Sequence, residues 1–151
     1  MGQPALPTYV PAVQGPGTPL AGRFPFQLLT PKHHQRFLNS GYSHLPNHGG
    51  REGGPFVEVC ADDAGALGVG DGDIVDVFND AGRVEVPVRV SARVRPGVVS
   101  IPWGWWGAHH TNGQVANSLT NDTLTEWGGG VAYSDTLVAI HPRMGAKTTD
   151  T

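Results

Sequence analysis

The chain has 151 residues and a mass of 15.9 kDa, which suffices for one hydrophobic core of ordinary size. Its 22 glycines and 13 prolines, with only 15% charged residues, favour a mainly β protein and argue against long helices. The formal net charge of -3 excludes a broad basic surface of the kind that binds duplex DNA or an anionic membrane.

Cys60 is the only cysteine, so an internal disulfide and a cysteine-built zinc or iron–sulfur site are excluded. No apolar run approaches the roughly 18 residues of a membrane span. The N-terminus also lacks a basic-then-apolar signal pattern. We therefore expect a cytoplasmic chain without a membrane or nucleic-acid partner.

The predicted organisation is one domain with two tails. Residues 1–22 are rich in proline and have little periodicity, which indicates a linker or disordered tail, with docking on another domain as the alternative. Residues 23–143 are expected to form the folded domain, and residues 144–151 a C-terminal tail. Within the domain, an apolar run ending at Pro31 predicts a first strand. Residues 32–55 form a long polar loop, and loops of this length are usually functional or disordered.

The middle of the chain carries the clearest local patterns. Residues 57–60 alternate as a strand, after which Asp62 is predicted to cap a short helix that ends at Gly68. Residues 73–78 and 83–90 are predicted strands joined by a hairpin, with alternate valines of the second strand on one face. Pro87 lies on the other face and cannot donate to a ladder, so we expect this strand at an edge or bulged.

Two further strands complete the pattern. A turn at Pro96-Gly97 precedes one of them, and residues 135–142 form the last. About six strands with one or two short helices predict a compact barrel.

Familiar catalytic patterns are weak or missing. Seven histidines invite a metal site, but their spacing is poor, and Pro46 and two glycines argue against a helix that would align His44 with His48. No Gly-x-Ser-x-Gly turn occurs. The stretch "GVGDGD" precedes a strand rather than a helix, so the argument for a phosphate-binding loop fails.

Two polar loops remain, "FLNSGYSHLPNHGG" (37–50) and "WGWWGAHHTNGQVANSLT" (103–120). Amides, hydroxyls, imidazoles and exposed backbone suit a flat heteroaromatic ring, and Trp or His can pack on its face. A pyrophosphate would add a demand for backbone N–H groups and a few cations. The residues that could meet both demands are His34, Arg36, Asn39, Ser40, Asn112, Asn117 and Thr120. Alternatively, Trp103, Trp105 and Trp106 merely plug one end of the barrel.

In their order, these segments resemble one family. It is the C-terminal, molybdopterin-dinucleotide-binding domain of the molybdenum and tungsten oxidoreductases related to dimethyl sulfoxide reductase, formate dehydrogenase and nitrate reductase. The resemblance runs from about Phe24 to His141 and rests on "FPFQLLTPKHHQRFLNSGYSHLP", "VEVCADDAGALGVGDGDIVDVF" and "NSLTNDTLTEWGGGVAYSDTLVAI". Ala61 departs from the proline that the family often has before its helix. The metal ligand and iron–sulfur cysteines of such enzymes lie in other domains.

This resemblance implies a six-stranded double-psi β-barrel of the aspartate-decarboxylase-like type. It implies a molybdopterin guanine dinucleotide as cofactor, with molybdenum or tungsten carried together with the rest of the enzyme. The domain would position and tune this cofactor without being catalytic on its own. Its partners would be upstream domains or subunits of the parent oxidoreductase, and in isolation it would be monomeric. The implied cofactor-binding residues are Thr30, His33, His34, Arg36, Asn39, Ser40, Trp105, Gly107, Asn117 and Thr120, with most weight on His34, Asn39 and Asn117.

Two other functions fit the sequence less completely. A freestanding double-psi barrel could serve as a protein-binding module, which leaves the polar loops unexplained. A small β-domain could instead stack sugars on Trp105 and Trp106.

Overall fold

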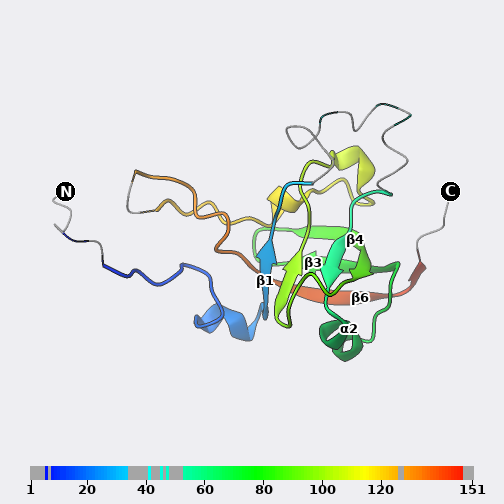
Figure 1. Ribbon diagram of the computed structural model, residues 1–151, viewed down its shortest axis with the longest axis horizontal. Helices are drawn as coiled ribbons and strands as arrows, with labels where there is room; N and C mark the ends of the chain where they lie inside the picture. Colours follow the sequence, from blue (N-terminus) through cyan, green and yellow to red (C-terminus); the bar gives the residue numbers. More distant parts are fainter. Residues whose placement is uncertain are drawn as a thin grey trace.

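A computed structural model describes residues 6, 8–33, 41, 45, 47, 53–125 and 128–147. In this part of the chain, six strands close into a barrel in the order β1-β5-β2-β4-β3-β6 (Figure 1). The mainly β, six-stranded prediction is confirmed, and the topology is consistent with a double-psi barrel. The strands are β1 (Phe26–Leu29), β2 (Val57–Val59), β3 (Asp73–Phe78), β4 (Arg83–Val90), β5 (Val98–Ser100) and β6 (Leu137–Lys147). The helix α2 (Ala61–Leu67) and the 3₁₀ turns η2 (Gly107–His109) and η3 (Ala116–Ser118) lie between strands, and the 3₁₀ turn η1 (Pro19–Gly22) precedes β1.

The core is built from alternate residues of the strands. Val75 and Val77 of β3 are completely buried, as are Val84 and Val86 of β4, and Val88 is 3% exposed. Successive side chains of a strand point to opposite faces, so the predicted valine stripe faces the barrel interior. Burying a valine side chain contributes roughly 1.5–3 kcal/mol, which makes this stripe a main source of stability.

The prediction that places β4 at an edge is wrong, because β4 lies between β2 and β3 in the closed barrel. Pro87 opposes Ile74 of β3, while the parallel pairing with β2 begins only at Val88. Pro87, which has no backbone N–H, therefore lies just before the first residue of β4 that pairs with β2. A barrel has no edge strand, and its closure depends on distant pairings that the local pattern of β4 does not reveal.

The helix α2 begins two residues earlier than predicted. Cys60, not Asp62, is the N-cap, and its Sγ accepts a hydrogen bond from the N–H of Asp63 at 3.5 Å. Gly68 ends the helix in the left-handed conformation at φ 69°, as predicted. Within the described ranges, no helix is long and apolar enough to cross a membrane.

The parallel pairing of β1 with β5 brings the ends of two distant segments together. Beyond the strands, the N–H of Ile101 donates to the carbonyl of Leu29 at 2.9 Å. The N–H of Trp103 then donates to the carbonyl of Pro31 at 3.1 Å, and Lys32 forms a parallel bridge with Trp103. The loops that follow the two strands therefore leave the barrel side by side.

The turn between β3 and β4 supports a third segment. The side-chain amide of Asn79 donates to the carbonyl of Leu119 at 2.8 Å and to that of Leu137 at 3.1 Å. Its Oδ1 accepts from the N–H groups of Ala81 and Gly82 at 2.9 and 3.2 Å. One side chain thus joins the turn, the segment after η3 and the start of β6.

Gly82→Ala should separate this turn from η3. A Cβ at position 82 would lie 2.6 Å from the backbone oxygen of Ser118, so the backbone must shift. We expect a loss of about 1–3 kcal/mol in the free energy of unfolding, measured by chemical denaturation.

The matched control is Gly65→Ala in α2, where a Cβ would meet nothing within 4 Å. This variant should gain about 0.5–1 kcal/mol, because alanine is the better helix former. Equal stabilities of the two variants would show that Gly82 is not packed against Ser118.

Candidate functional site

A cleft opens where the end of β1, the end of β5 and the segment around η3 meet. Its volume is about 1110 Å³. Most of its lining side chains are polar, and the exposed ring of Trp103 contributes an aromatic face. The polar residues are Gln14, Thr30, Lys32, Asp80, Asn117, Thr120, Asn121, Asp122, Thr123 and Tyr133.

Asn117 is an exposed member of η3 with one half of its amide already engaged. Its Oδ1 accepts a hydrogen bond from the hydroxyl of Thr120 at 3.0 Å, and the same hydroxyl lies 3.1 Å from the carbonyl of Asn117. The fully buried Leu119 and its bond from Asn79 anchor this turn. The Nδ2 donors of Asn117 make no hydrogen bond within the described residues, so they remain for a ligand in the cleft.

The charged groups of the cleft differ in their pairing. Asp80 is neutralised by Arg23, whose guanidinium donates two bonds to its carboxylate at 2.6 and 3.1 Å. Lys32 and Asp122 form no ion pair with any residue that the structure describes. The cleft therefore offers a cation and a carboxylate that can each contact a ligand.

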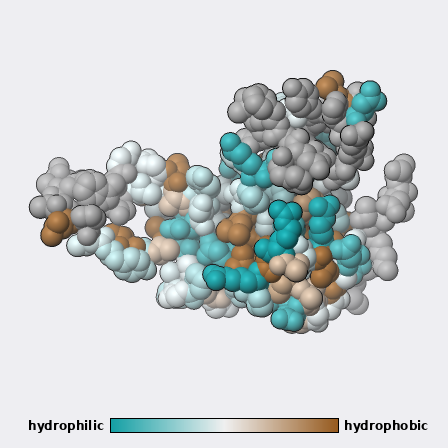
Figure 2. All heavy atoms as spheres, viewed as in Figure 1, coloured by the Kyte–Doolittle hydropathy of each residue, from teal (hydrophilic) through white to brown (hydrophobic). Residues whose placement is uncertain are grey.

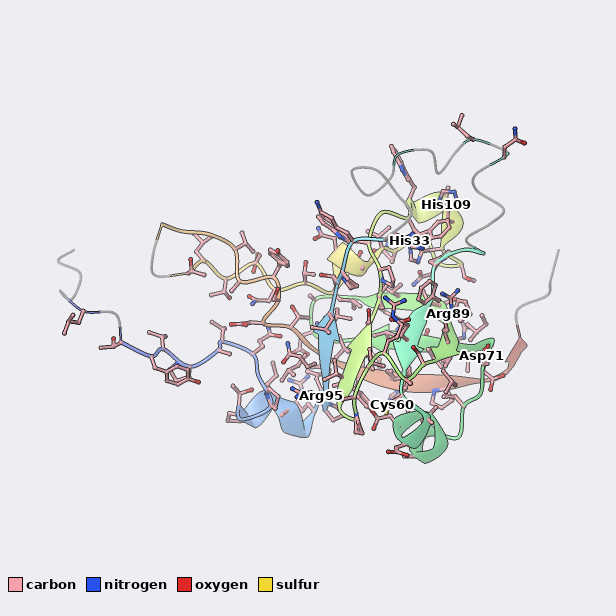
Figure 3. The ribbon with its side chains drawn as sticks, in the orientation of Figure 1. His33, Cys60, Asp71, Arg89, Arg95 and His109 are labelled. Atoms are coloured by element: carbon pink, nitrogen blue, oxygen red, sulfur yellow. The ribbon has the colours of Figure 1, made fainter. Side chains whose placement is uncertain are left out.

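A second cluster of aromatic side chains lies beside the cleft. Trp105 is 7% exposed and packs edge to face against His33 and His109, with ring centroids 6.3 and 5.3 Å apart. Figure 3 shows His33 and His109 close together above the barrel. The Nδ1 of His109 accepts from the N–H of Trp106 at 3.3 Å. Since His33 follows β1 and Trp105 follows β5, this cluster also joins the two segments that leave the barrel together.

His110 follows this cluster and is only 7% exposed. Its Nδ1 has no hydrogen-bond partner among the described residues. Burial, together with the nearby charge of His109, lowers the pKa of His110 to about 4. The side chain is therefore neutral at physiological pH.

The structure brings three of the ten predicted binding residues into the cleft: Thr30, Asn117 and Thr120. Three others lie in or beside the aromatic cluster, namely His33, Trp105 and Gly107. A Cβ at Gly107 would lie 2.6 Å from the backbone oxygen of Gly113, so this glycine allows the loop to fold on itself. The remaining four, His34, Arg36, Asn39 and Ser40, lie outside the described residues.

Three further predictions concern Asn112, the tryptophans and a metal site. Asn112 donates to the carbonyl of Arg83 at 3.0 Å and accepts from the N–H of Glu85 at 3.4 Å, so it ties the loop to β4. Trp105 is buried, which leaves only Trp106, at 56% exposure, to offer a ring face for the sugar-stacking alternative. Among the described residues, no three His, Cys, Asp or Glu side chains form a group that could hold a metal.

The sequence did not predict several residues that line the cleft. Lys32 directly follows the predicted first strand, and a cation at the end of a strand could have indicated a site for an anionic ligand. Gln14 lies in the predicted linker, while Asp122 and Tyr133 lie beyond the predicted loop. No local pattern marks these three, because only the folded backbone brings them to the cleft.

The chain is similar to known proteins in both sequence and fold. The family described as the molydopterin dinucleotide binding domain matches residues 26–137. Probable oxidoreductase YoaE of Bacillus subtilis is 34% identical over 139 residues, which cover 92% of this chain and 19% of that protein. Dimethyl sulfoxide reductase DmsA of Escherichia coli is 33% identical over 108 residues, which cover 67% and 12%. Acetylene hydratase from Pelobacter acetylenicus shares the fold with a TM-score of 0.75 at 19% identity, covering 90% of this chain and 21% of that one.

His110 should make the stability of the chain depend on pH. Its pKa is lower in the folded chain than the ordinary 6.5, so the unfolded chain binds the proton more readily. Stability from this group is complete above pH 6.5 and falls as the pH drops toward 4. At 1.36 kcal/mol per pKa unit, the loss down to pH 4 is about 3 kcal/mol.

Chemical denaturation between pH 4 and 7.5 measures this loss. His110→Asn should flatten the pH dependence by that amount, because asparagine does not titrate. His141→Asn on β6 is the control and should keep the dependence of the unmodified chain. An unchanged slope in His110→Asn would contradict the assignment.

Proposed function

Because the chain belongs to the molydopterin dinucleotide binding domain family, we propose that it is the cofactor-binding domain of a larger molybdenum or tungsten oxidoreductase. The chain spans at most about a fifth of the relatives and the structural neighbour described above. The observation that carries the proposal is the cleft that the ends of β1 and β5 form with the segment around η3. The substrate of the parent enzyme belongs to its other domains.

The donor set of the cleft fits a dinucleotide. The ammonium of Lys32 and the Nδ2 group of Asn117 are suited to pyrophosphate oxygens, because both are donors and neither accepts. The hydroxyls of Thr30 and Thr120 add short-range polar contacts, and the ring of Trp103 offers a face for stacking. His34, Arg36, Asn39 and Ser40 are proposed to complete the site from the loop after β1.

A carboxylate in the cleft supports the guanine form of the cofactor. Guanine presents two neighbouring N–H donors on its edge, and a carboxylate can accept both. Asp122 lines the cleft without an ion pair in the described part of the chain, so it can take this role. Asp80 is less suited because Arg23 already engages both of its oxygens.

In this proposal, the domain itself binds the cofactor and orients it. The cofactor, when bound, supplies the metal-centred chemistry, and the side chains of this chain hold its nucleotide end. The barrel keeps the binding groups in place through backbone ladders and the bonds of Asn79.

Asn117→Asp tests the proposal with little change of shape. Asp keeps an oxygen that can accept from Thr120, but it replaces the Nδ2 donors with a second, negatively charged oxygen. In the parent enzyme we expect cofactor occupancy to fall at least about tenfold, since a charge-assisted hydrogen bond contributes roughly 1.5–3 kcal/mol. Occupancy is measured as molybdenum or tungsten content and as guanine nucleotide released on acid hydrolysis.

Gln114→Glu provides the matched control on the same loop. It makes the same amide-to-acid change and keeps an oxygen that accepts from the Ser118 hydroxyl, a bond of 3.0 Å, but it lies outside the cleft. Occupancy should remain at the level of the unmodified enzyme. If both variants lose cofactor equally, or neither does, Asn117 does not hold the dinucleotide.

A further inference from the structure

Two segments project from the same side of the barrel (Figure 1). We call residues 8–18 the arm and residues 121–125 with 128–136 the hairpin. Both carry apolar side chains that the barrel does not cover. On the arm, Tyr9 is 88% exposed, and Val10 and Val13 are each 52% exposed. On the hairpin, Leu124 is 63% exposed and Tyr133 is 56% exposed, and Figure 2 shows hydrophobic residues along this projecting part.

The hairpin is held in its direction by its base. Asn121 is buried, and its Nδ2 donates to the carbonyls of Ala132 and Asp135, both at 2.9 Å. Its N–H donates to the hydroxyl of the fully buried Thr136 at 3.1 Å. A bridge between Leu124 and Val131 continues the pairing outward. These bonds organise the hairpin before any partner binds, so its apolar side chains are presented in a defined arrangement.

The arm is tied to the same base. The N–H of Val13 donates to the carboxylate of Asp135 at 3.4 Å, and the N–H of Leu137 donates to Oε1 of Gln14 at 3.2 Å. Gln14 and Tyr133 both line the polar cleft. The two projections therefore border the proposed cofactor site.

The chemistry of the arm indicates a permanent partner. Residues 1–22 contain no Lys, Arg, Asp or Glu, so electrostatic steering cannot bring a partner to this segment. Charge depletion with exposed Tyr and aliphatic residues is typical of the buried centre of stable interfaces. Exposed apolar residues grouped in this way usually mark an interaction surface.

We propose that the arm and the hairpin together dock on the remaining polypeptide of the parent oxidoreductase. This inference rests on the proposed function. The related oxidoreductases YoaE and DmsA are several times longer than the part that this chain matches. The remaining polypeptide of such an enzyme is the partner that could cover the apolar side chains permanently. Because the projections border the cleft, the same body would cover the apolar side chains and close the cofactor site.

Thiol labelling of Leu124→Cys tests this docking, because Leu124 is exposed and does not line the cleft. Ala92→Cys, an exposed position on the turn between β4 and β5, is the matched control. Each substitution is placed in the 151-residue chain and in the full-length parent enzyme, and maleimide modification is followed by peptide mass spectrometry. Cys60 is buried and serves as the unreactive reference.

We expect the thiol introduced by Leu124→Cys to react at least about tenfold more slowly in the parent enzyme than in the 151-residue chain, because labelling of a covered site requires local opening. The thiol introduced by Ala92→Cys should react at similar rates in both. Equal reactivity at position 124 in the two proteins, or equal protection of both positions, would overturn the inference. Protection of position 124 in a dimer of the isolated chain, seen by light scattering, would assign the surface to a second copy and also overturn it. The metal and nucleotide content of the same enzyme preparations tests the proposed function separately.

Discussion

The parallel ladder between β1 and β5 is the constraint on which the rest of the structure depends. Parallel strands end at the same side of a sheet, so the loops after them must leave together. Here the pairing continues past both strands through the bonds from Ile101 and Trp103. Lys32 after β1 and Trp103 after β5 therefore share one wall of the cleft, and the segment around η3 supplies the other. The cleft is a consequence of barrel topology more than of any single side chain.

Local patterns predicted the parts of the fold that local physics controls. The valines of β3 and β4 alternate because one face is buried, and Gly68 ends α2 because glycine tolerates the left-handed conformation. The two errors have non-local or subtle causes. Pro87 indicated an edge, but barrel closure gives β4 a neighbour on both sides. Cys60 caps the helix ahead of Asp62, a role for which cysteine is not a usual candidate.

The polar residues of the site show why binding roles are harder to predict than strands. Asn79, Asn117 and Asn121 look alike in sequence. Two of them use their amides to satisfy backbone carbonyls and so build the scaffold. Only Asn117 keeps its donor group open toward the cleft, because Thr120 engages its oxygen alone. This difference depends on the folded backbone, and the spacing of the asparagines in the sequence does not predict it.

The same bonds couple the cleft to the projecting segments. Asn79 bonds both Leu119, beside Asn117, and Leu137, which also binds Gln14 of the arm. In the proposed docking, a partner that contacts the arm and the hairpin therefore acts on the backbone that positions the cleft. By linkage, a cofactor that binds the ordered cleft favours the docked projections by the same free energy. Under the proposed function and docking, cofactor retention and assembly of the parent enzyme would be two results of one set of contacts.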